Sequence, residues 1–365
     1  MLYRPNELAR IHRYIQNHPN HKYIATGDSD QNKPFGQSMN NIKDMTQYVN
    51  DCINIIFPAQ IYLKVNKRLK TQDDRNKLVG LKTDVFDKTI SVIDICKKYN
   101  ISTETDFNNV KTKNNITYFN DYAKKVNKHI HGLYGKQTKH TIEVNGIGYY
   151  PGLELVCEKH YQNKGFRLFV NYTYVIKSVN KSECVIVEPN EDVYITLKTE
   201  NLTTLFRLPY ANTCHSVQGL SITNKITIFN ANIEQFADRN WFWTAITRAT
   251  ELDNITVFIH SDEEIQNMAD KRKMMKYFRQ KVSGYIDQDS NKGRLIKSRS
   301  YITAEWIMSK YEQTKECPGC HNPYEFTFSY NSVKSNLSVD RINNKLAHHR
   351  DNCELLCVQC NCAKH

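Results

Sequence analysis

Two periodicities of apolar residues divide the chain. From 146 to 206, β-branched and aromatic residues form short runs with a period of two, which Asn, Gly, Lys and Pro separate. This period is typical of half-buried strands. Five such runs predict a small β-barrel, and they are Leu153–Cys157, Arg167–Val170, Tyr172–Val179, Glu183–Val187 and Val193–Leu197.

Other segments have the patterns of helices and buried strands. Helical spacing predicts three helices, and unbroken apolar runs predict two strands. The helices lie at 6–17, 241–249 and 262–282, and the strands at 226–229 and 254–260. The polar, Gly-containing segment 283–300 predicts a linker and a domain boundary.

Composition narrows the class of protein. The chain has 365 residues and a net charge of +12, which favours a polyanionic partner such as nucleic acid. No run approaches the roughly eighteen apolar residues of a membrane span, and no charged-then-apolar leader opens the sequence. We therefore expect a soluble, intracellular protein of several domains that has no membrane partner. Its Asn- and Lys-rich usage is typical of AT-rich genomes. The pairing of modules described below would suit a large DNA virus or a mobile element.

A cluster of polar residues marks one turn of the chain. Four hydrogen-bonding side chains lie close together in it: Thr213, His215, Ser216 and Gln218. Gly219 allows the backbone to approach a ligand closely. The sequence therefore predicts a polar edge that contacts phosphates or sugars.

The predicted helix at 241–249 combines an apolar face with one arginine. Trp241, Ala245 and Ile246 would face a core, while Arg248 would project from near the end of the helix. An arginine held on a packed helix can bind a phosphate through two parallel hydrogen bonds. Arg248 is therefore a candidate phosphate ligand.

The polar turn and this helix together resemble motifs V and VI of RecD-like superfamily 1 helicases, T-x-H-x-x-Q-G and A-x-T-R-A. The residues identical to these motifs are Thr213, His215, Gln218, Gly219, Ala245, Thr247, Arg248 and Ala249. In that family the first motif grips the nucleic-acid backbone, and the second supplies an arginine finger to the γ-phosphate of ATP. The resemblance covers residues 22–260. It implies a RecA-like parallel α/β sheet, with the β region as an SH3-like insertion.

Two further segments resemble parts of the same helicases. Residues 61–68 resemble motif IV, a strand that ends in an arginine aimed at the nucleotide, here Arg68. Residues 115–120 resemble the first strand of the second RecA-like domain. The resemblance implies that Asn120, at the turn into the following helix, contacts the nucleic-acid backbone.

Residues 27–31 resemble helicase motif III, G-D-x-x-Q, which closes the first RecA-like domain. Gln31 would sense the γ-phosphate, and Asp28 would fix the loop. In the family, the P-loop and the acidic magnesium motif precede motif III. Gly132–Gln137 is too short for a P-loop and lacks its hydroxyl. Binding of ATP and Mg²⁺ therefore depends on a P-loop half from elsewhere, such as a partner chain.

The cysteines predict a metal site near the C-terminus. Six of the eleven lie after residue 316, which is typical of metal binding in a reducing compartment. Two C-x-x-C knuckles each present two thiolates from one turn. The predicted ligands of a structural Zn²⁺ are Cys317, Cys320, Cys357 and Cys360.

The segments between and after the knuckles resemble the HNH (His-Me finger) endonuclease fold, a β-hairpin and helix around one catalytic metal. They are Leu337–Asn343, His348–Asn352 and Cys360–Lys364. The resemblance implies that Asp340 and Asn361 hold Mg²⁺ beside the scissile phosphate. Asn352 would pin the loop.

One position departs from the HNH pattern. Active members carry a water-activating histidine after the aspartate, where this chain has Arg341. A guanidinium stays protonated near neutrality and cannot act as the general base. Either His348 or His349 activates the water, or the module has lost cleavage and kept phosphate binding, with Arg341 on a phosphate.

These patterns predict five parts: the end of a first RecA-like domain (1–40), a second RecA-like domain (41–145 and 207–282), a β insertion (146–206), a linker (283–300) and an HNH-like zinc domain (301–365). The predicted function is a helicase-type motor fragment in replication, repair or recombination. It would act on DNA or RNA, single-stranded for the motor part. Two alternatives stay open: an HNH endonuclease targeted by a degenerate helicase domain, and a non-catalytic nucleic-acid-binding protein.

Overall fold

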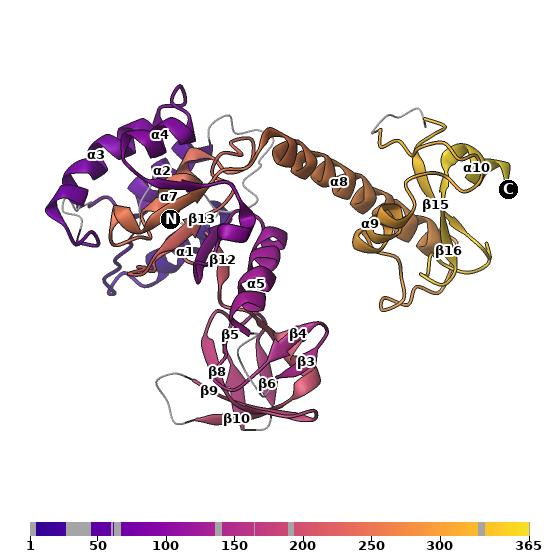
Figure 1. The fold of residues 1–365 in the computed structure, drawn as a ribbon, viewed down its shortest axis with the longest axis horizontal. Helices are drawn as coiled ribbons and strands as arrows, with labels where there is room; N and C mark the ends of the chain where they lie inside the picture. The colour runs from indigo at the N-terminus through magenta and orange to yellow at the C-terminus, as the bar shows by residue number, and fades with distance from the viewer. Residues whose placement is uncertain are drawn as a thin grey trace. The chain divides into compact units, whose positions relative to one another are not determined.

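The computed structural model describes residues 5–26, 45–59, 61, 67–135, 141–163, 165–188, 193–327 and 333–364. The chain forms two compact units that divide after His260, and each unit is described by itself (Figure 1). None of the described helices is long and apolar enough to cross a lipid bilayer.

A five-stranded sheet is the centre of the first unit. Its order is β1–β14–β13–β2–β12, and every neighbouring pair runs parallel. The strands are β1 (Ser102–Glu104), β14 (Ile255–Phe258), β13 (Ile226–Ile228), β2 (Asn114–Thr117) and β12 (Ala211–Thr213). The three central strands are almost entirely buried, as expected for a parallel sheet with helices on its faces. The sheet confirms the predicted RecA-like α/β fold class.

Several helices of this part begin after polar residues that cap them. The helices are α1 (Pro5–Asn17), α2 (Met45–Ile56), α3 (Gln72–Phe86), α4 (Val92–Lys98), α5 (Asn120–Gly135) and α7 (Arg239–Ile246), with the 3₁₀-helices η1 (Phe107–Asn109) and η3 (Leu252–Asn254). The side chains of Thr71, Ser91 and Asp238 accept hydrogen bonds from the first turns of α3, α4 and α7.

Helix α7 buries Trp241, Ala245 and Ile246 in the core, as predicted. It ends at Ile246, before the predicted end at 249, because the chain after it pairs with another segment. Ile222 N–H donates to Arg248 O at 2.8 Å, and the N–H of residue 250 donates to Ile222 O at 3.1 Å.

The β insertion forms an antiparallel sheet in the order β10–β9–β8–β5–β11. Its strands are β5 (Glu154–Cys157), β8 (Thr173–Val179), β9 (Glu183–Val187), β10 (Tyr194–Lys198) and β11 (Phe206–Arg207). Two hairpins accompany it, β3–β4 (Ile142–Val144 and Ile147–Tyr149) and β6–β7 (Tyr161–Asn163 and Phe166–Leu168), with η2 (Thr199–Asn201) and α6 (Leu202–Leu205). Helix α5 leads from the parallel sheet towards this insertion (Figure 1).

Four of the five predicted strands of the insertion join its sheet. The strand predicted at 167–170 pairs with β6 instead. Strand β11 takes the last place in the sheet, beside β5. With two residues, β11 is too short to show a period of two, so the sequence carried no signal for it.

The second unit consists of two helices and a ββα module. Its elements are α8 (Asp262–Asn291), α9 (Ala304–Gln313), the antiparallel pair β15 (Leu337–Arg341) and β16 (Cys353–Cys357), and α10 (Val358–Ala363). Ser261 and Glu264 form a capping box at the start of α8. The predicted linker at 283–300 is wrong for its first half, because α8 continues to Asn291.

Asp289, in the last turns of α8, gives the reason for this continuation. It is fully buried, and its Oδ2 accepts hydrogen bonds from the main chain and the imidazole of His348 and from the Tyr301 hydroxyl, each at 2.8 Å. Arg341 and Arg294 pair with its Oδ1 at 2.8 and 3.1 Å. Burial alone would raise the pKa of Asp289, but the hydrogen bonds lower it to about 2. A buried charge with this many partners holds the surrounding segments in one arrangement.

We expect Asp289→Asn to destabilise the second unit by about 3 kcal/mol, because loss of the carboxylate charge leaves two partly buried arginines uncompensated. Hydrogen exchange of this unit in increasing denaturant measures the effect. Asp287→Asn, exposed on the same helix, is the matched control. Equal protection in the two variants would contradict the role of Asp289.

The same carboxylate predicts a pH dependence. Its folded-state pKa of about 2 lies below the ordinary value of 3.8. It therefore stabilises the unit above about pH 4 and loses this contribution as the pH falls towards 2. The stability of the Asp289→Asn variant should change less over that range.

Candidate nucleic-acid interface and metal centre

The polar turn, residues 213–219, follows the edge strand β12. Ser216 Oγ donates to Thr213 O at 2.7 Å, and Thr213 Oγ1 donates to Ser216 Oγ at 3.3 Å, so the two hydroxyls lie side by side. Gly219 has a φ of 93°, which favours glycine. The polar turn thus lies at the carboxyl end of a parallel strand, where α/β sheets bind ligands.

Helix α5 carries a polar stripe on one face. Its members are Asn120, Lys124, Asn127, Lys128 and His131, each three or four residues from another member, the spacings that share a face. Asn127 fixes the helix to β12, because its Nδ2 donates to Ala211 O at 2.9 Å and its Oδ1 accepts from Ala211 N–H at 3.0 Å. The α5 stripe and the polar turn are therefore held at a constant separation.

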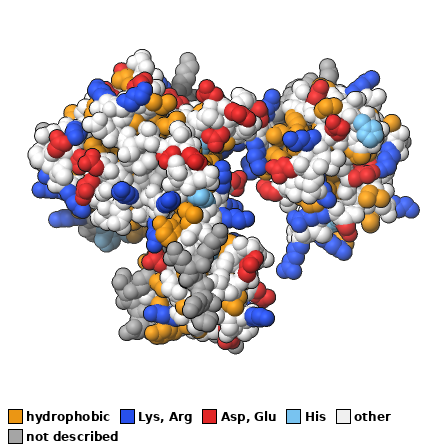
Figure 2. Space-filling view, in the orientation of Figure 1, with side chains coloured by type: hydrophobic (Ala, Val, Ile, Leu, Met, Phe, Trp, Pro, Cys, Tyr) orange, Lys and Arg blue, Asp and Glu red, His pale blue; other side chains and the backbone are white. Residues whose placement is uncertain are grey.

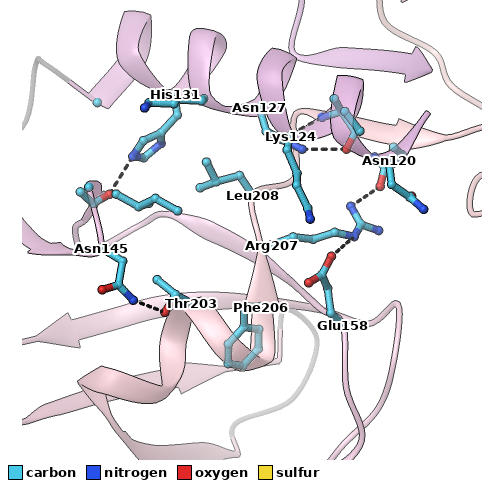
Figure 3. A pocket seen from close by; sticks show the side chains of 18 of the residues that line it. Asn120, Lys124, Asn127, His131, Asn145, Glu158, Thr203, Phe206, Arg207 and Leu208 are labelled. Carbon is cyan, nitrogen blue, oxygen red and sulfur yellow. Dashed lines mark hydrogen bonds and ion pairs between the residues drawn. The ribbon is translucent and has the colours of Figure 1, made fainter. Parts of the chain in front are cut away.

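A cavity of about 1080 Å³ lies between the α5 stripe, the polar turn and the β insertion (Figure 3). Arg207 of β11 donates to Asn212 Oδ1, and its Nε lies 3.8 Å from Glu158 Oε1. One guanidinium therefore links β11, β12 and the segment after β5. Burial lowers the pKa of Arg207 and Glu158 opposes this shift, but an arginine stays charged.

The charge of this cavity is mainly positive. Its lining contains four basic side chains, Lys124, Lys128, Lys159 and Arg207, against the two acidic side chains Glu143 and Glu158. Burial lowers the pKa of His131, whose Nε2 donates to Gly148 O at 2.7 Å, so the lysines and arginine supply the charge. Basic and acidic side chains are interspersed on the face in Figure 2, so net charge alone does not locate a binding site.

The structure brings together some of the predicted nucleic-acid contacts. Asn120 and Thr213 line the cavity. His215, Gln218 and Gly219 belong to the polar turn, but they are not among the lining residues. Arg341, which lies in the second unit, pairs internally with Asp289.

The cations of the cavity were not predicted from the sequence. Lys124 and Lys128 lie one helical turn apart, and the polar spacing along α5 is the signal that could have found them. Arg207 reaches the cavity only because β11 joins the sheet of the insertion, and no local pattern indicates that pairing.

Arg248 lies inside the protein. Its side chain is fully buried and donates to Thr244 O at 3.0 Å, Leu220 O at 3.2 Å and Thr247 Oγ1 at 3.1 Å. The expectation that Arg248 projects from its helix is wrong, because these acceptors hold the guanidinium against the residue that follows the polar turn. The same contacts do bring the two predicted motifs together.

Arg68 approaches the same place. Its Nε donates to Ser221 Oγ at 2.9 Å, and its Nη1 donates to Thr247 O at 2.6 Å. Burial lowers its pKa. Two residues predicted to face a nucleotide, Arg68 and Arg248, thus meet around Thr247. The other two, Asp28 and Gln31, lie outside the described residues, as does most of the predicted motif IV strand.

The predicted metal ligands converge in the second unit. The Sγ atoms of Cys317, Cys320, Cys357 and Cys360 all lie within 4.8 Å of one another, and no other such group occurs in the described part of the chain. Cys320 Sγ and Cys357 Sγ are 3.8 Å apart. Bonds of about 2.3 Å to a central ion give a tetrahedron with edges of about 3.8 Å. The four-cysteine cluster can therefore hold a metal ion.

Backbone N–H groups donate to two of these sulfurs. Cys357 N–H donates to Cys317 Sγ, and Cys360 N–H donates to Cys357 Sγ, each at 3.3 Å. Burial opposes ionisation of Cys317, but backbone N–H groups lower its pKa to about 7. A Cβ at Gly319 would lie 3.1 Å from Cys360 Sγ, so glycine lets the first knuckle approach the second.

Asp340 and Asn361 do not fit a magnesium site. Asp340 is buried, and Lys364 Nζ lies 3.0 Å from its Oδ2. Lys364 also pairs with Glu354. Asn361 Nδ2 donates to Ser338 Oγ at 2.9 Å. The Asp340 carboxylate, which would bind Mg²⁺, is thus neutralised by the ammonium group of Lys364. The Asn361 amide is hydrogen-bonded to the Ser338 hydroxyl.

His348 also serves the packing of the second unit. It is buried against Tyr285, with ring centroids 4.3 Å apart, and its Nδ1 donates to Asp289. Burial lowers the pKa of His348, which Asp289 opposes. The imidazole is therefore part of the buried network around Asp289.

His349 and Asn352 organise the loop between β15 and β16. The His349 Nε2 donates to Leu295 O at 3.0 Å, and its Nδ1 accepts from Ser300 Oγ at 3.1 Å. Asn352 Nδ2 donates to Asn343 O at 3.1 Å, and its Oδ1 accepts from Asn343 N–H at 2.9 Å. This is the geometry of a loop pin, the role expected for Asn352.

Comparisons with known proteins give a likeness in structure only. Neither a known family model nor a curated protein matches the sequence. Among solved structures, the chain is similar to Pif1 helicases, which belong to the RecD-like superfamily 1. One, of two coordinating Pif1 helicases at forked double-stranded DNA, is 14% identical, with 75% of this chain and 72% of that chain covered and a TM-score of 0.45.

Two further neighbours are similar to the same extent. Bacteroides Pif1 bound to single-stranded DNA is 11% identical over 75% of this chain and 73% of that chain, with a TM-score of 0.45. Pif1 helicase from Candida albicans is 12% identical over 74% of each chain, with a TM-score of 0.43. TM-scores below 0.5 carry no functional conclusion, so function is inferred from the residues of this chain.

We expect the purified protein to carry one metal ion per chain and Cys320→Ser to lose it, because three thiolates no longer close a tetrahedral site. Elemental analysis after dialysis measures the metal content. Cys362→Ser changes an exposed cysteine outside the four-cysteine cluster and is the matched control. Equal loss of metal in both variants would show that the ion binds elsewhere.

Proposed function

We propose that the first unit binds a nucleic-acid strand as the second motor domain of a superfamily 1 helicase. One observation carries this proposal: the hydroxyl of Thr213 and the lysines of the α5 stripe line a single cavity at the carboxyl edge of a parallel sheet. This combination joins one residue of the strand-gripping motif, Thr213, to cations that the motif does not contain.

Phosphate groups match the chemistry of this cavity. The ammonium groups of Lys124 and Lys128 neutralise phosphates along a strand without reading its sequence. The hydroxyls of Thr213 and Ser216 can each donate to a phosphate oxygen when they exchange their present acceptors. Asn127 holds α5 against β12, since its side-chain amide is hydrogen-bonded to the main chain of Ala211.

A nucleotide site next to this strand is the second part of the proposal. Arg68 would reach the γ-phosphate of an ATP held by a P-loop domain, which a partner chain supplies together with Mg²⁺. Arg248 acts as a positioning residue, because its guanidinium holds Leu220, directly after the polar turn. Nucleotide binding at Arg68 would then affect the grip on the strand through Thr247, whose carbonyl accepts from Arg68.

For the second unit we propose a zinc-stabilised module that does not cut nucleic acid. Four thiolates at tetrahedral spacing suit Zn²⁺. The order β15–β16–α10 agrees with an HNH-like fold and favours an endonuclease as the second candidate. The partners of its catalytic positions favour the non-cutting module, since Lys364 neutralises Asp340 and Asp289 engages His348.

The double change Lys124→Ala and Lys128→Ala should weaken binding of a single-stranded oligonucleotide and reduce the magnitude of the slope of log K against log salt by about 1.4, because two phosphate contacts are lost. Fluorescence anisotropy over a salt series measures both quantities. Lys88→Ala with Lys97→Ala removes two exposed lysines outside the cavity and is the matched control. An equal effect of both pairs would assign the binding to net charge alone.

We expect no nicking of supercoiled plasmid by the purified chain in Mg²⁺ or Mn²⁺, because Asp340 is neutralised by Lys364. Gel electrophoresis of the plasmid over time measures this. Nicking that is abolished by Asp340→Ala would establish the endonuclease instead. Nicking that survives Asp340→Ala would point to a contaminating nuclease.

A further inference from the structure

An exposed aromatic corner lies at the rim of the cavity. We use this name for Arg167, Phe169 and Tyr172 of the β insertion. The side chains of Phe169 and Tyr172 are 40% and 52% exposed. The two residues between them, Val170 and Asn171, line the cavity itself. Two large, partly exposed rings are therefore directly joined in the chain to residues that line a basic cavity.

The backbone holds these rings in place. Asn171 N–H donates to Cys157 O at 2.8 Å, and Cys157 N–H donates to Tyr172 O at 2.9 Å, so the corner is tied to β5. Asn171 has a φ of 67°, in the left-handed region, which turns the chain sharply between the two rings. Because the turn is already ordered, the rings lose little conformational freedom when a ligand binds.

The two rings of the corner are partly exposed and inclined to each other. The centroids of Phe169 and Tyr172 are 5.4 Å apart, and the ring planes are inclined by 42°, so the rings do not stack face to face. The guanidinium of Arg167 lies 5.2 Å from the Phe169 centroid. Exposed aromatic rings beside cations stack on nucleobases of any sequence, because every base has a π-face.

We propose that the aromatic corner stacks on unpaired bases of the strand whose phosphates lie along Lys124 and Lys128. The ligand of the cavity is therefore single-stranded nucleic acid, since the bases of a duplex are paired and stacked on one another. This inference rests on the proposed function of the cavity and adds a base-stacking site outside the cavity lining. It also gives the β insertion a direct part in binding.

The full-length chain and three fluorescent probes test the inference. The probes are a single-stranded DNA oligonucleotide, an oligonucleotide of the same length with abasic sites throughout, and a blunt duplex. Phe169→Ala with Tyr172→Ala should weaken binding of the first probe roughly tenfold or more and leave binding of the abasic probe unchanged, because only stacking is removed. The duplex should bind more weakly than the single strand to the wild-type chain.

Two variants complete the experiment. Tyr194→Ala removes an equally exposed tyrosine from β10, away from the cavity lining, and should leave all affinities unchanged. Phe169→Trp with Tyr172→Trp keeps the rings and should retain binding of the single strand. The stacking role is overturned if the double alanine variant binds the ordinary and the abasic single strand with equally reduced affinity. It is also overturned if the affinity for the ordinary single strand does not fall.

The outcomes separate this inference from the function on which it rests. If the wild-type chain binds no probe at low salt, the proposed function fails. If the wild-type chain binds in a salt-dependent manner that Lys124→Ala with Lys128→Ala weakens, but the double alanine variant of the corner binds normally, the aromatic corner alone is refuted.

Discussion

The hydrogen bonds between the Asn127 side chain and the main chain of Ala211 are the contact on which the candidate interface depends. A buried amide satisfied by one residue of an edge strand fixes both the distance and the rotation of the helix relative to the sheet. Lys124 lies almost one turn before Asn127, and Thr213 lies two residues after Ala211. Each therefore reaches the cavity only while this contact is made.

A second set of contacts joins the polar turn to the predicted nucleotide side. The pairing of Ile222 with the chain at 248–250 and the hydrogen bond from Arg248 to Leu220 O make one continuous structure of the two motifs. A buried guanidinium is costly to move unless its acceptors move with it. Displacement of Thr247 would thus be passed to the polar turn, which is the mechanical property that a motor domain requires.

The negatively charged groups of the second unit have two kinds of surroundings. The sulfurs of its four clustered cysteines converge on one point, and backbone N–H groups lower the pKa of Cys317 to about 7. Its carboxylates instead form ion pairs with cationic side chains. Asp289 pairs with Arg294 and Arg341, and Asp340 pairs with Lys364. The negative charge of the four-cysteine cluster can be balanced by a metal ion, whereas the carboxylates of Asp289 and Asp340 are already balanced by protein side chains. The ion pair in the folded unit uses the Asp340 carboxylate for Lys364, whereas metal-dependent cleavage would require the same carboxylate to bind a metal ion.

The sequence by itself determined the features that depend on local pattern. The buried strands at 226–229 and 254–260, four strands of the insertion and the four cysteines followed from period, apolar length and ligand spacing, because these signals act over a few residues. The tertiary structure alone decided what depends on distant partners. Residues 283–291 have the composition of a linker, yet they are helical because Asp289 finds partners up to 59 positions away. The Arg248 side chain was expected to project from its helix, but it is buried. Its acceptor Leu220 O is 28 residues away in the sequence, so no local pattern indicated this contact. The cavity likewise exists only where α5, β12 and β11 meet, and no stretch of sequence contains all three.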